Sequence, residues 1–179
     1  DCVWGGMVNP KLAVALTGRS GEALEDYKKL MLKLNNEVAA AAPEDLLINT
    51  HVCRGNYHST FFSSGAYDSV ADLLFGEENV NAYYLEYDDE RSGGFAPLAK
   101  VSGDKKVVLG LVTTKTPVLE NKEIVINRIH EAAKYVPLDR LYLSPQCGFA
   151  SCEIGNKLTE EEQWAKLKLV KEIAEEVWG

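Results

Sequence analysis

The most constraining feature of the sequence is a regular recurrence of short apolar runs, each followed by a stretch with helical periodicity. The runs begin near residues 46, 80, 106 and 140, and they cover 46–50, 80–86, 106–112 and 140–144. A short, continuous apolar run is typical of a strand buried on both faces, as in a parallel sheet. Because helices alternate with these strands, the pattern predicts four successive βα units.

The helical stretches are recognised by apolar residues three and four positions apart. The pattern predicts helices over 20–42 and 66–75, another around Val125 and Ile129, and a last helix that Thr159 and Glu162 open with a capping box. Such apolar stripes are typical of the buried face of a helix. The stripe of the first helix is Leu24, Tyr27, Leu30, Met31, Leu34 and Val38, and that of the last is Trp164, Leu167, Val170, Ala174 and Val177.

Four βα units amount to half of a (β/α)8 TIM barrel, whose usual size is about 250 residues. The predicted fold class is therefore α/β, with residues 1–179 forming half of such a barrel. A doubly wound open sheet is the alternative, but it would normally bring a glycine-rich phosphate loop, and the sequence has no GxGxxG or Walker pattern. The chain opens with Asp1-Cys2-Val3-Trp4 and no initiator Met, so we expect either processing or a piece of a longer chain.

The net charge of the chain limits the kinds of partner that it can bind. The chain has 19 Lys and Arg against 27 Asp and Glu, a net charge of −8. Binding to nucleic acid or to anionic membranes needs clustered basic residues. No apolar run approaches the ~18 residues of a membrane-spanning helix, and no signal-peptide pattern opens the chain. We therefore expect a cytoplasmic protein that binds neither nucleic acid nor membrane.

Residues of the types that bind metals stand at the ends of three predicted strands. His51 and Cys53 follow the first strand, Glu86 ends the second, and Cys147 follows the fourth. In a barrel, the carboxyl ends of the strands meet at one rim. Zinc takes four ligands from Cys, His and carboxylate side chains, so the placement indicates a zinc site. A hydrogen-bonded loop histidine, packed thiols and a solvated carboxylate are the alternative interpretation.

Three segments resemble the cobalamin-independent methionine synthase family. They are His51-Val52-Cys53, Leu85-Glu86 and Ser144-Pro145-Gln146-Cys147-Gly148, in this order and at these intervals, and they look closest to the short single-barrel bacterial relatives. The resemblance covers nearly the whole chain and implies that residues 1–179 are the C-terminal half of the catalytic barrel. It also implies that the missing N-terminal half-barrel is a partner of this chain.

The resemblance further implies a cofactor and a reaction. One zinc ion would be bound by His51, Cys53, Glu86 and Cys147, and no cobalamin would be needed. The methyl group of a 5-methyltetrahydrofolate polyglutamate would pass to the thiol of homocysteine and give methionine. The family's aspartate that binds the amine of the amino-acid substrate would fall just before Asp1, outside this chain.

The chain departs from the family pattern at the proton donor. The family has a His-Ser-Pro sequence there, and this chain has Lys115-Thr116-Pro117. A lysine ammonium can donate a proton, but its ordinary pKa of about 10.4 makes it a weak acid near neutrality. A solvated rim lysine is the alternative for Lys115. For the protein, the alternatives are another methyl donor or a non-catalytic zinc-binding fragment.

Two neighbouring segments are also relevant. The charged run from Asp88 to Arg91 favours a solvated loop over a substrate-binding one. The aromatic residues Tyr57, Phe61 and Phe62 would either wall the pocket or pack beneath it. Cys152 lies close to Cys147 in sequence, but nothing requires it as a ligand.

Overall fold

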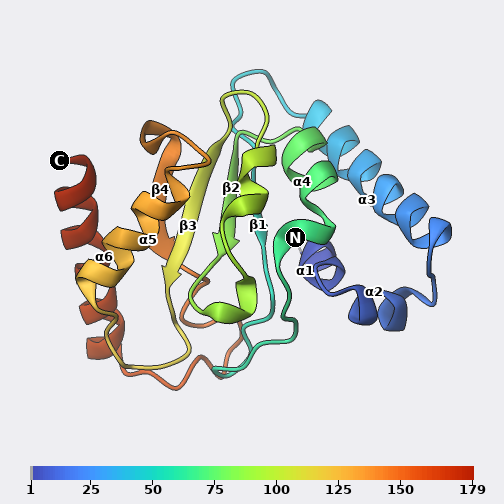
Figure 1. Ribbon diagram of the computed structural model, residues 1–179. Coiled ribbons are helices and arrows are strands. Elements are labelled where there is room, and N and C mark those ends of the chain that lie inside the picture. The colour runs from blue at the N-terminus through green and yellow to red at the C-terminus, as the bar shows by residue number, and fades with distance from the viewer. Residues whose placement is uncertain (1) are drawn as a thin grey trace.

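The computed structural model describes residues 2–179 and contains one parallel four-stranded sheet (Figure 1). Its strands are β1 (Asn49–Val52), β2 (Ala82–Glu86), β3 (Lys106–Val112) and β4 (Leu141–Pro145). The order β1-β2-β3-β4 follows the chain, and every neighbouring pair is parallel. An order that follows the chain without reversal is that of a barrel segment, whereas a doubly wound sheet reverses at a switch point. The α/β class with a parallel sheet is confirmed.

Helices connect the strands and precede them. They are α1 (Cys2–Met7), α2 (Pro10–Thr17), α3 (Glu22–Ala40), α4 (Ala71–Glu77), α5 (Lys122–Ala132) and α6 (Glu160–Trp178). Short 3₁₀ turns are η1 (Tyr67–Ser69), η2 (Glu90–Ser92), η3 (Ala96–Lys100) and η4 (Leu138–Arg140). The predicted capping box of α6 is present, because Thr159 and Glu162 each accept a hydrogen bond from the other's backbone N–H. Within residues 2–179, no helix has the length and apolar character needed to cross a bilayer.

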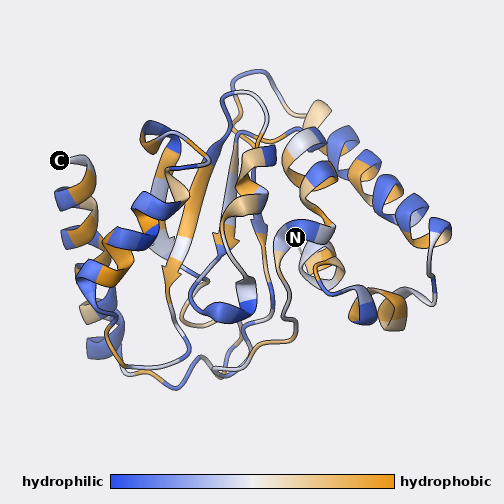
Figure 2. Ribbon diagram, viewed as in Figure 1, coloured by the Kyte–Doolittle hydropathy of each residue, from blue (hydrophilic) through white to orange (hydrophobic). Residues whose placement is uncertain are grey.

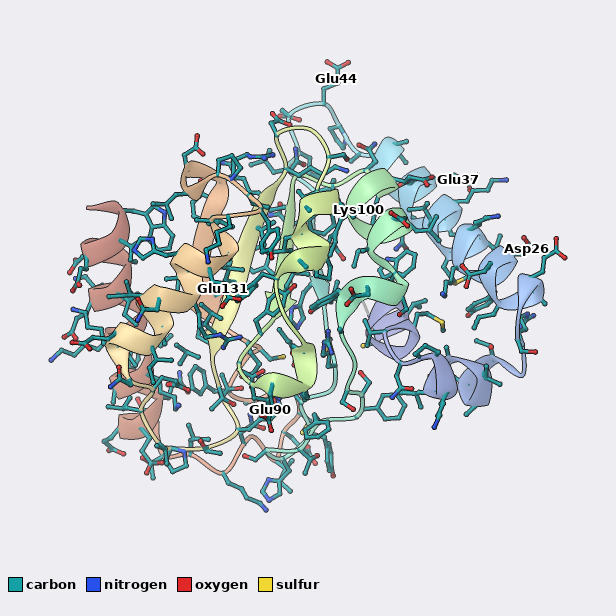
Figure 3. The ribbon with its side chains drawn as sticks, viewed as in Figure 1. Asp26, Glu37, Glu44, Glu90, Lys100 and Glu131 are labelled. Atoms are coloured by element: carbon teal, nitrogen blue, oxygen red, sulfur yellow. The ribbon has the colours of Figure 1, made fainter. Side chains whose placement is uncertain are left out.

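The two faces of the sheet differ. Side chains alternate along a strand, so Tyr83, Leu85 and Leu109 point into a core shared with α4 and α5, where they are buried. Figure 2 shows that apolar residues concentrate on the strands. Tyr84 and Tyr142 point to the opposite, exposed face, which lines an open cavity of about 780 Å³. Charged side chains such as Asp26, Glu37 and Glu131 point outward from the helices (Figure 3).

The first strand and the helix after it start later than predicted. The first strand is Asn49–Val52 and not 46–50, and Leu47 is 72% exposed. A turn from Pro43 to Leu46 directs the side chains of Leu46 and Leu47 outward. The N–H of Ile48 donates to the side chain of Asn81 and not to a neighbouring strand. The helix predicted from residue 66 begins as η1, and α4 starts only at Ala71, because the non-helical backbone of Val70 (φ −127°, ψ −6°) separates the two.

The apolar stripes predict the buried faces of α3 and α6 only in part. Leu24 of the α3 stripe is buried and Val177 of the α6 stripe packs against the core, but Leu30, Leu34 and Val38 are exposed on α3, as is Trp164 on α6. Each helix also buries a lysine that is paired with hydrogen-bond acceptors. The ammonium of Lys28 donates to Glu25 and to the carbonyl of Ser69, and that of Lys166 donates to Glu120 and to the carbonyl of Val118. A buried ammonium is tolerated when it is paired, and apolar periodicity cannot reveal this.

Candidate metal centre

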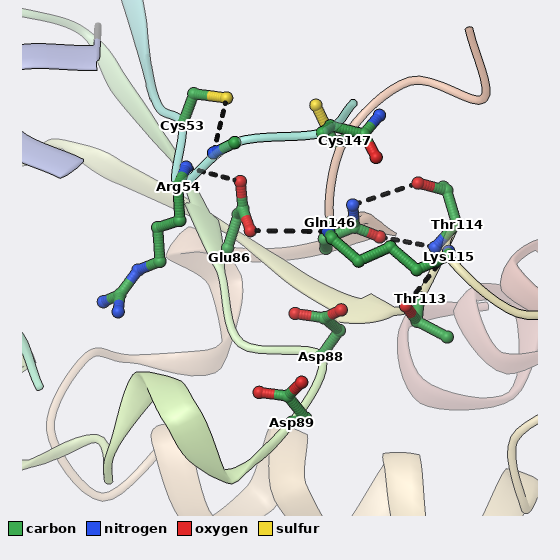
Figure 4. A network of polar contacts seen from close by, with 12 residues as sticks. Cys53, Arg54, Glu86, Asp88, Asp89, Thr113, Thr114, Lys115, Gln146 and Cys147 are labelled. Atoms are coloured by element: carbon green, nitrogen blue, oxygen red, sulfur yellow. Dashed lines mark hydrogen bonds and ion pairs between the residues drawn. The ribbon is translucent and has the colours of Figure 1, made fainter. Parts of the chain in front are cut away.

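The structure brings together the four residues predicted as metal ligands. His51 lies in β1, and Cys53 is the first residue after that strand. Glu86 is the last residue of β2, and Cys147 lies two positions after the end of β4. One ligand atom from each lies within 4.8 Å of the others. Figure 4 shows Cys53, Glu86 and Cys147 converging at the carboxyl ends of the strands. The parallel register causes this, because it aligns the carboxyl ends of β1, β2 and β4 along one edge.

A glycine in β3 allows β4 to approach closely at this edge. A Cβ on Gly110 would lie 2.6 Å from the carbonyl oxygen of Leu85 and 2.7 Å from the Cα of Gln146. The register between β3 and β4 shifts at the same place, between Gly110 and Val112. A strand glycine often marks such a backbone approach. Gly110 therefore lets the chain segment that carries Cys147 lie against β3.

His51 is oriented by the backbone of the neighbouring strand. Its Nδ1 lies 3.1 Å from the carbonyl oxygen of Tyr84, which can only accept, so Nδ1 carries the proton. The other ring nitrogen, Nε2, is then available to the cluster, where His51 also interacts with the thiol of Cys147. A histidine that donates one N–H to a carbonyl and presents the other nitrogen is typical of metal sites.

The thiols of Cys53 and Cys147 are hydrogen-bonded to each other. The hydrogen bond from Cys53 lowers the pKa of Cys147, and contacts with His51 and Ser151 lower it further against the opposing effect of burial. The same contact and burial raise the pKa of Cys53. Only the thiolate form of cysteine binds metals. The contacts around Cys147 therefore shift this cysteine toward the form that binds metals.

Glu86 is a fully buried carboxylate with a donor on each oxygen. Burial raises its pKa, and this is opposed by the backbone N–H of Arg54 and by the charges of Lys115 and Arg91. The N–H of Arg54 lies 2.7 Å from Oε1, and Nη2 of Arg91 lies 2.8 Å from Oε2. These contacts balance the cost of placing a carboxylate inside the protein.

The donor set fits zinc. One imidazole nitrogen, two thiol sulfurs and one carboxylate oxygen form the set. Zinc binds these atom types in fourfold sites, whereas magnesium and calcium prefer oxygen ligands only. The three strand ends that carry the ligands are fixed by the sheet, so the fold itself brings the ligands together.

A largely buried polar network, which the sequence did not reveal, joins the loops around the cluster. We call Asn56, Thr114, Gln146 and Asn156 the loop clamp. Nδ2 of Asn156 donates to Oδ1 of Asn56 at 2.9 Å and to the carbonyl of Thr114 at 2.8 Å. Nδ2 of Asn56 donates to the carbonyl of Gly148 at 2.7 Å, and Nε2 of Gln146 donates to the hydroxyl of Thr114 at 3.0 Å. The clamp thus ties together the loops that carry Cys53, Lys115 and Cys147.

Lys115 is buried beside the cluster and is not a solvated rim lysine. It is 8% exposed, and its Nζ lies 3.9 Å from Oε2 of Glu86. Within residues 2–179, this ammonium finds no hydrogen-bond acceptor. Lys115 therefore lies next to the candidate ligands with donor capacity to spare.

The charged run after β2 agrees only in part with its prediction as a solvated loop, because Asp89 and Glu90 are exposed but their two neighbours are not. Arg91 folds back onto Glu86, and the Arg91 and Asp88 side chains are only 7% and 1% exposed. Among the aromatic residues after Cys53, all of Tyr57, Phe61 and Phe62 are exposed, so none packs beneath the site.

A cavity of about 300 Å³ opens beside the cluster and is lined by His51, Tyr84, Ser144, Gln146 and Cys147, among others. Cys152 is half-buried and lies outside the cluster.

Residues 28–176 match the family model described as "Cobalamin-independent synthase, Catalytic domain". The chain is 52% identical to the uncharacterized protein YxjG of Bacillus subtilis over 159 residues, which are 88% of this chain and 42% of that protein. It is 35% identical over 77 residues to a methionine synthase of Methanothermobacter marburgensis, covering 43% of this chain and 23% of that protein. The chain thus spans less than half the length of these relatives.

Solved structures show the same relationship. The putative vitamin-B12 independent methionine synthase from Listeria monocytogenes superposes with a TM-score of 0.73 and 38% identity, over 100% of this chain and 47% of that chain. A B12-independent methionine synthase from Shewanella, solved in complex with selenomethionine, has a TM-score of 0.68 over 86% of this chain and 44% of that chain. Its sequence identity is 21%, so this second likeness shows the fold alone.

Proposed function

Because the chain belongs to the cobalamin-independent methionine synthase family, we propose that it forms the zinc-binding half of a homocysteine methyltransferase. The reaction is transfer of a methyl group from a 5-methyltetrahydrofolate polyglutamate to the thiol of homocysteine, giving methionine without cobalamin. The observation that carries the proposal is the convergence of His51, Cys53, Glu86 and Cys147 at one edge of the sheet.

The proposed ligands suit alkylation of a thiol. With two thiolates and one carboxylate, a bound zinc ion would have a formal local charge of +2 − 3, or −1. Such an ion would keep the incoming substrate thiol deprotonated at neutral pH while leaving it electron-rich. The 300 Å³ cavity that reaches His51 and Cys147 is the space for that thiol.

Lys115 is the proposed proton donor. The folate leaves as a poor leaving group, so an acid must protonate it as the bond to the methyl carbon breaks. Lys115 is buried next to Glu86, and its Nζ has no hydrogen-bond acceptor within the described residues, so its protons are available to a substrate.

We also propose that the chain corresponds to the C-terminal half of a closed barrel. In residues 2–179, β1 and β4 are the edges of the sheet, and each lacks a neighbour on one side. A TIM barrel pairs every strand on both sides. The chain also covers only 42% of YxjG and 47% of the Listeria protein. A further four-stranded half would close the barrel and complete the substrate pocket.

Substitution of the cysteines tests the zinc site. Cys53→Ser and Cys147→Ser each remove a thiolate from a four-ligand site, so we expect loss of stoichiometric zinc from the complete protein. Cys152→Ser is the matched control and should keep one zinc per chain, measured by atomic emission. Full zinc retention in Cys147→Ser would refute the ligand assignment.

A shift of the zinc X-ray absorption edge on adding homocysteine would support catalysis. A zinc ion whose absorption edge does not change would favour a non-catalytic fragment.

A further inference from the structure

Arg91 carries a buried guanidinium that contacts Glu86 and two further carboxylates. Its Nη2 lies 2.8 Å from Oε2 of Glu86 and 2.9 Å from Oδ1 of Asp88, and its Nη1 bonds Asp89. The Arg91 and Asp88 side chains keep only 7% and 1% of their surface exposed. Because little water surrounds these charges, they interact more strongly than a surface ion pair would.

The position of Arg91 is fixed by its own backbone and by an aromatic ring. Its N–H donates to Oδ1 of Asp89 at 3.0 Å, and its carbonyl accepts the N–H of Gly65 at 2.9 Å. The ring of Phe61 lies over the guanidinium, with the centroid 4.9 Å from Cζ. A cation over a ring face is attracted to it. Together these contacts hold Arg91 in place, so it presents a fixed donor to Glu86.

The contacts on Glu86 constrain the carboxylate without using up its binding capacity. The backbone N–H of Arg54 donates to Oε1 of Glu86 at 2.7 Å, and Nη2 of Arg91 donates to Oε2. Each carboxylate oxygen has two lone pairs and can accept more than one partner. One donor on each oxygen therefore fixes the plane of the carboxylate and still leaves lone pairs for a metal ion.

We propose that Arg91 is a positioning residue of the metal centre, which acts by orienting Glu86 toward Cys53 and Cys147. The proposal rests on the proposed zinc site. Residues that orient a metal ligand typically contribute about 10- to 100-fold to metal affinity. Lys115 lies farther from Glu86, at 3.9 Å, and cannot replace the direct contact of Arg91.

A double-mutant cycle on zinc affinity tests the proposal, with affinity measured by competition against a chelating indicator in the complete protein. Arg91→Met should weaken zinc binding by about 10-fold, since Glu86 loses its orienting donor. In a Glu86→Gln background the same substitution should change affinity by less than about twofold, because Arg91 acts through that carboxylate. Arg91→Lys keeps the charge but loses the planar fork, so its effect should be intermediate.

Arg140→Met is the matched control. It removes the same charge from an arginine that bonds backbone carbonyls of Gly103 and Lys105 at the opposite ends of the strands, and it should leave zinc affinity unchanged. Arg91→Lys covers the case in which Arg91→Met fails to fold. Unchanged affinity in both Arg91 variants, or an undiminished effect in the Glu86→Gln background, would overturn the proposal. Failure of the unsubstituted protein to bind zinc would instead overturn the proposed function.

Discussion

At the scale of single residues, Glu86 differs from the other proposed ligands in how much of its charge the protein already balances. The N–H of Arg54, the guanidinium of Arg91 and the ammonium of Lys115 all face its two oxygens. The two cysteines instead contact each other, and Cys147 also contacts His51 and Ser151. Protein cations and a backbone N–H therefore balance much of the charge of Glu86.

We therefore expect Glu86 to be the most dispensable ligand. Oxygen is the hardest donor in an otherwise soft set, so Glu86→Gln should retain most of the zinc at saturation, although with weaker affinity. Homocysteine affinity, measured by calorimetry, should change, because the substrate thiolate would compete with this ligand. Complete zinc loss in Glu86→Gln would contradict the prediction that Glu86 is the most dispensable ligand. Cys147→Ser is the comparison variant, in which zinc should be lost.

Lys115 is the residue whose substitution separates chemistry from binding. Lys115→Ala in the complete protein should slow methyl transfer by about 10²- to 10⁴-fold, the usual contribution of a general acid. Zinc content and homocysteine binding should stay close to those of the unsubstituted protein. Single-turnover transfer of labelled methyl group measures the step directly.

The control for Lys115 is Lys100→Ala. Lys100 is an exposed lysine of η3 that pairs with Asp72, and its loss should leave transfer unchanged. If Lys115→Ala turns over at the rate of Lys100→Ala, Lys115 has no role as a proton donor.

At the scale of elements, the loop clamp holds together the loops that carry the two cysteines. Asn156 bonds Asn56 and Ser59 of the loop after β1 and Thr114 of the loop after β3. Gln146 directly precedes Cys147, and its Nε2 donates to the hydroxyl of Thr114. The loop after β4 is thereby fixed at both ends of the segment that contains the cysteine.

Removing the centre of the clamp should loosen the metal site as well as the fold. Asn156→Ala leaves the carbonyl of Thr114 and Oδ1 of Asn56 without a donor, which should cost about 1–3 kcal/mol in the free energy of unfolding. Zinc affinity should fall too, because Cys53 and Cys147 lose their common support. Asn36→Ala is the matched control, since Asn36 also bonds two backbone groups but joins α3 to the end of α4. An equal effect of both variants on zinc affinity would contradict this role.

The sequence predicted the features that depend on local pattern and missed those that depend on partners. Strands such as 106–112 and the juxtaposition of His51, Cys53, Glu86 and Cys147 follow from apolar runs and parallel topology. The buried faces of α3 and α6 followed only in part, because Lys28 and Lys166 are buried beside acceptors that are distant in sequence. Arg91 was missed for the same reason, since a charged run looks solvated until its fold onto Glu86 is known.

At the scale of the whole molecule, surfaces that a closed barrel would bury are open in this chain. Within the described part of the chain, the outer edges of β1 and β4 pair with no further strand, and Tyr84 and Tyr142 lie exposed on the face of the sheet that a barrel encloses. The exposed apolar residues Leu30, Leu34 and Val38 run along one side of α3. Open strand edges and contiguous apolar surface both promote association.

We therefore expect the polypeptide of residues 1–179, expressed alone, to be poorly soluble or self-associated and to lack methyl-transfer activity. Pairing with a preceding four-stranded half should cover both edges, fill the cavity of about 780 Å³ with side-chain layers and supply the rest of the substrate pocket. Sedimentation velocity and a methyl-transfer assay, run on the isolated chain and on the joined halves, measure the two properties separately. A soluble, monomeric and active isolated chain would show that the open edges need no partner and that the half-barrel assignment is wrong. Inactivity of the isolated chain with full zinc binding would instead place the missing function in the other half, because the four proposed ligands all lie in this one.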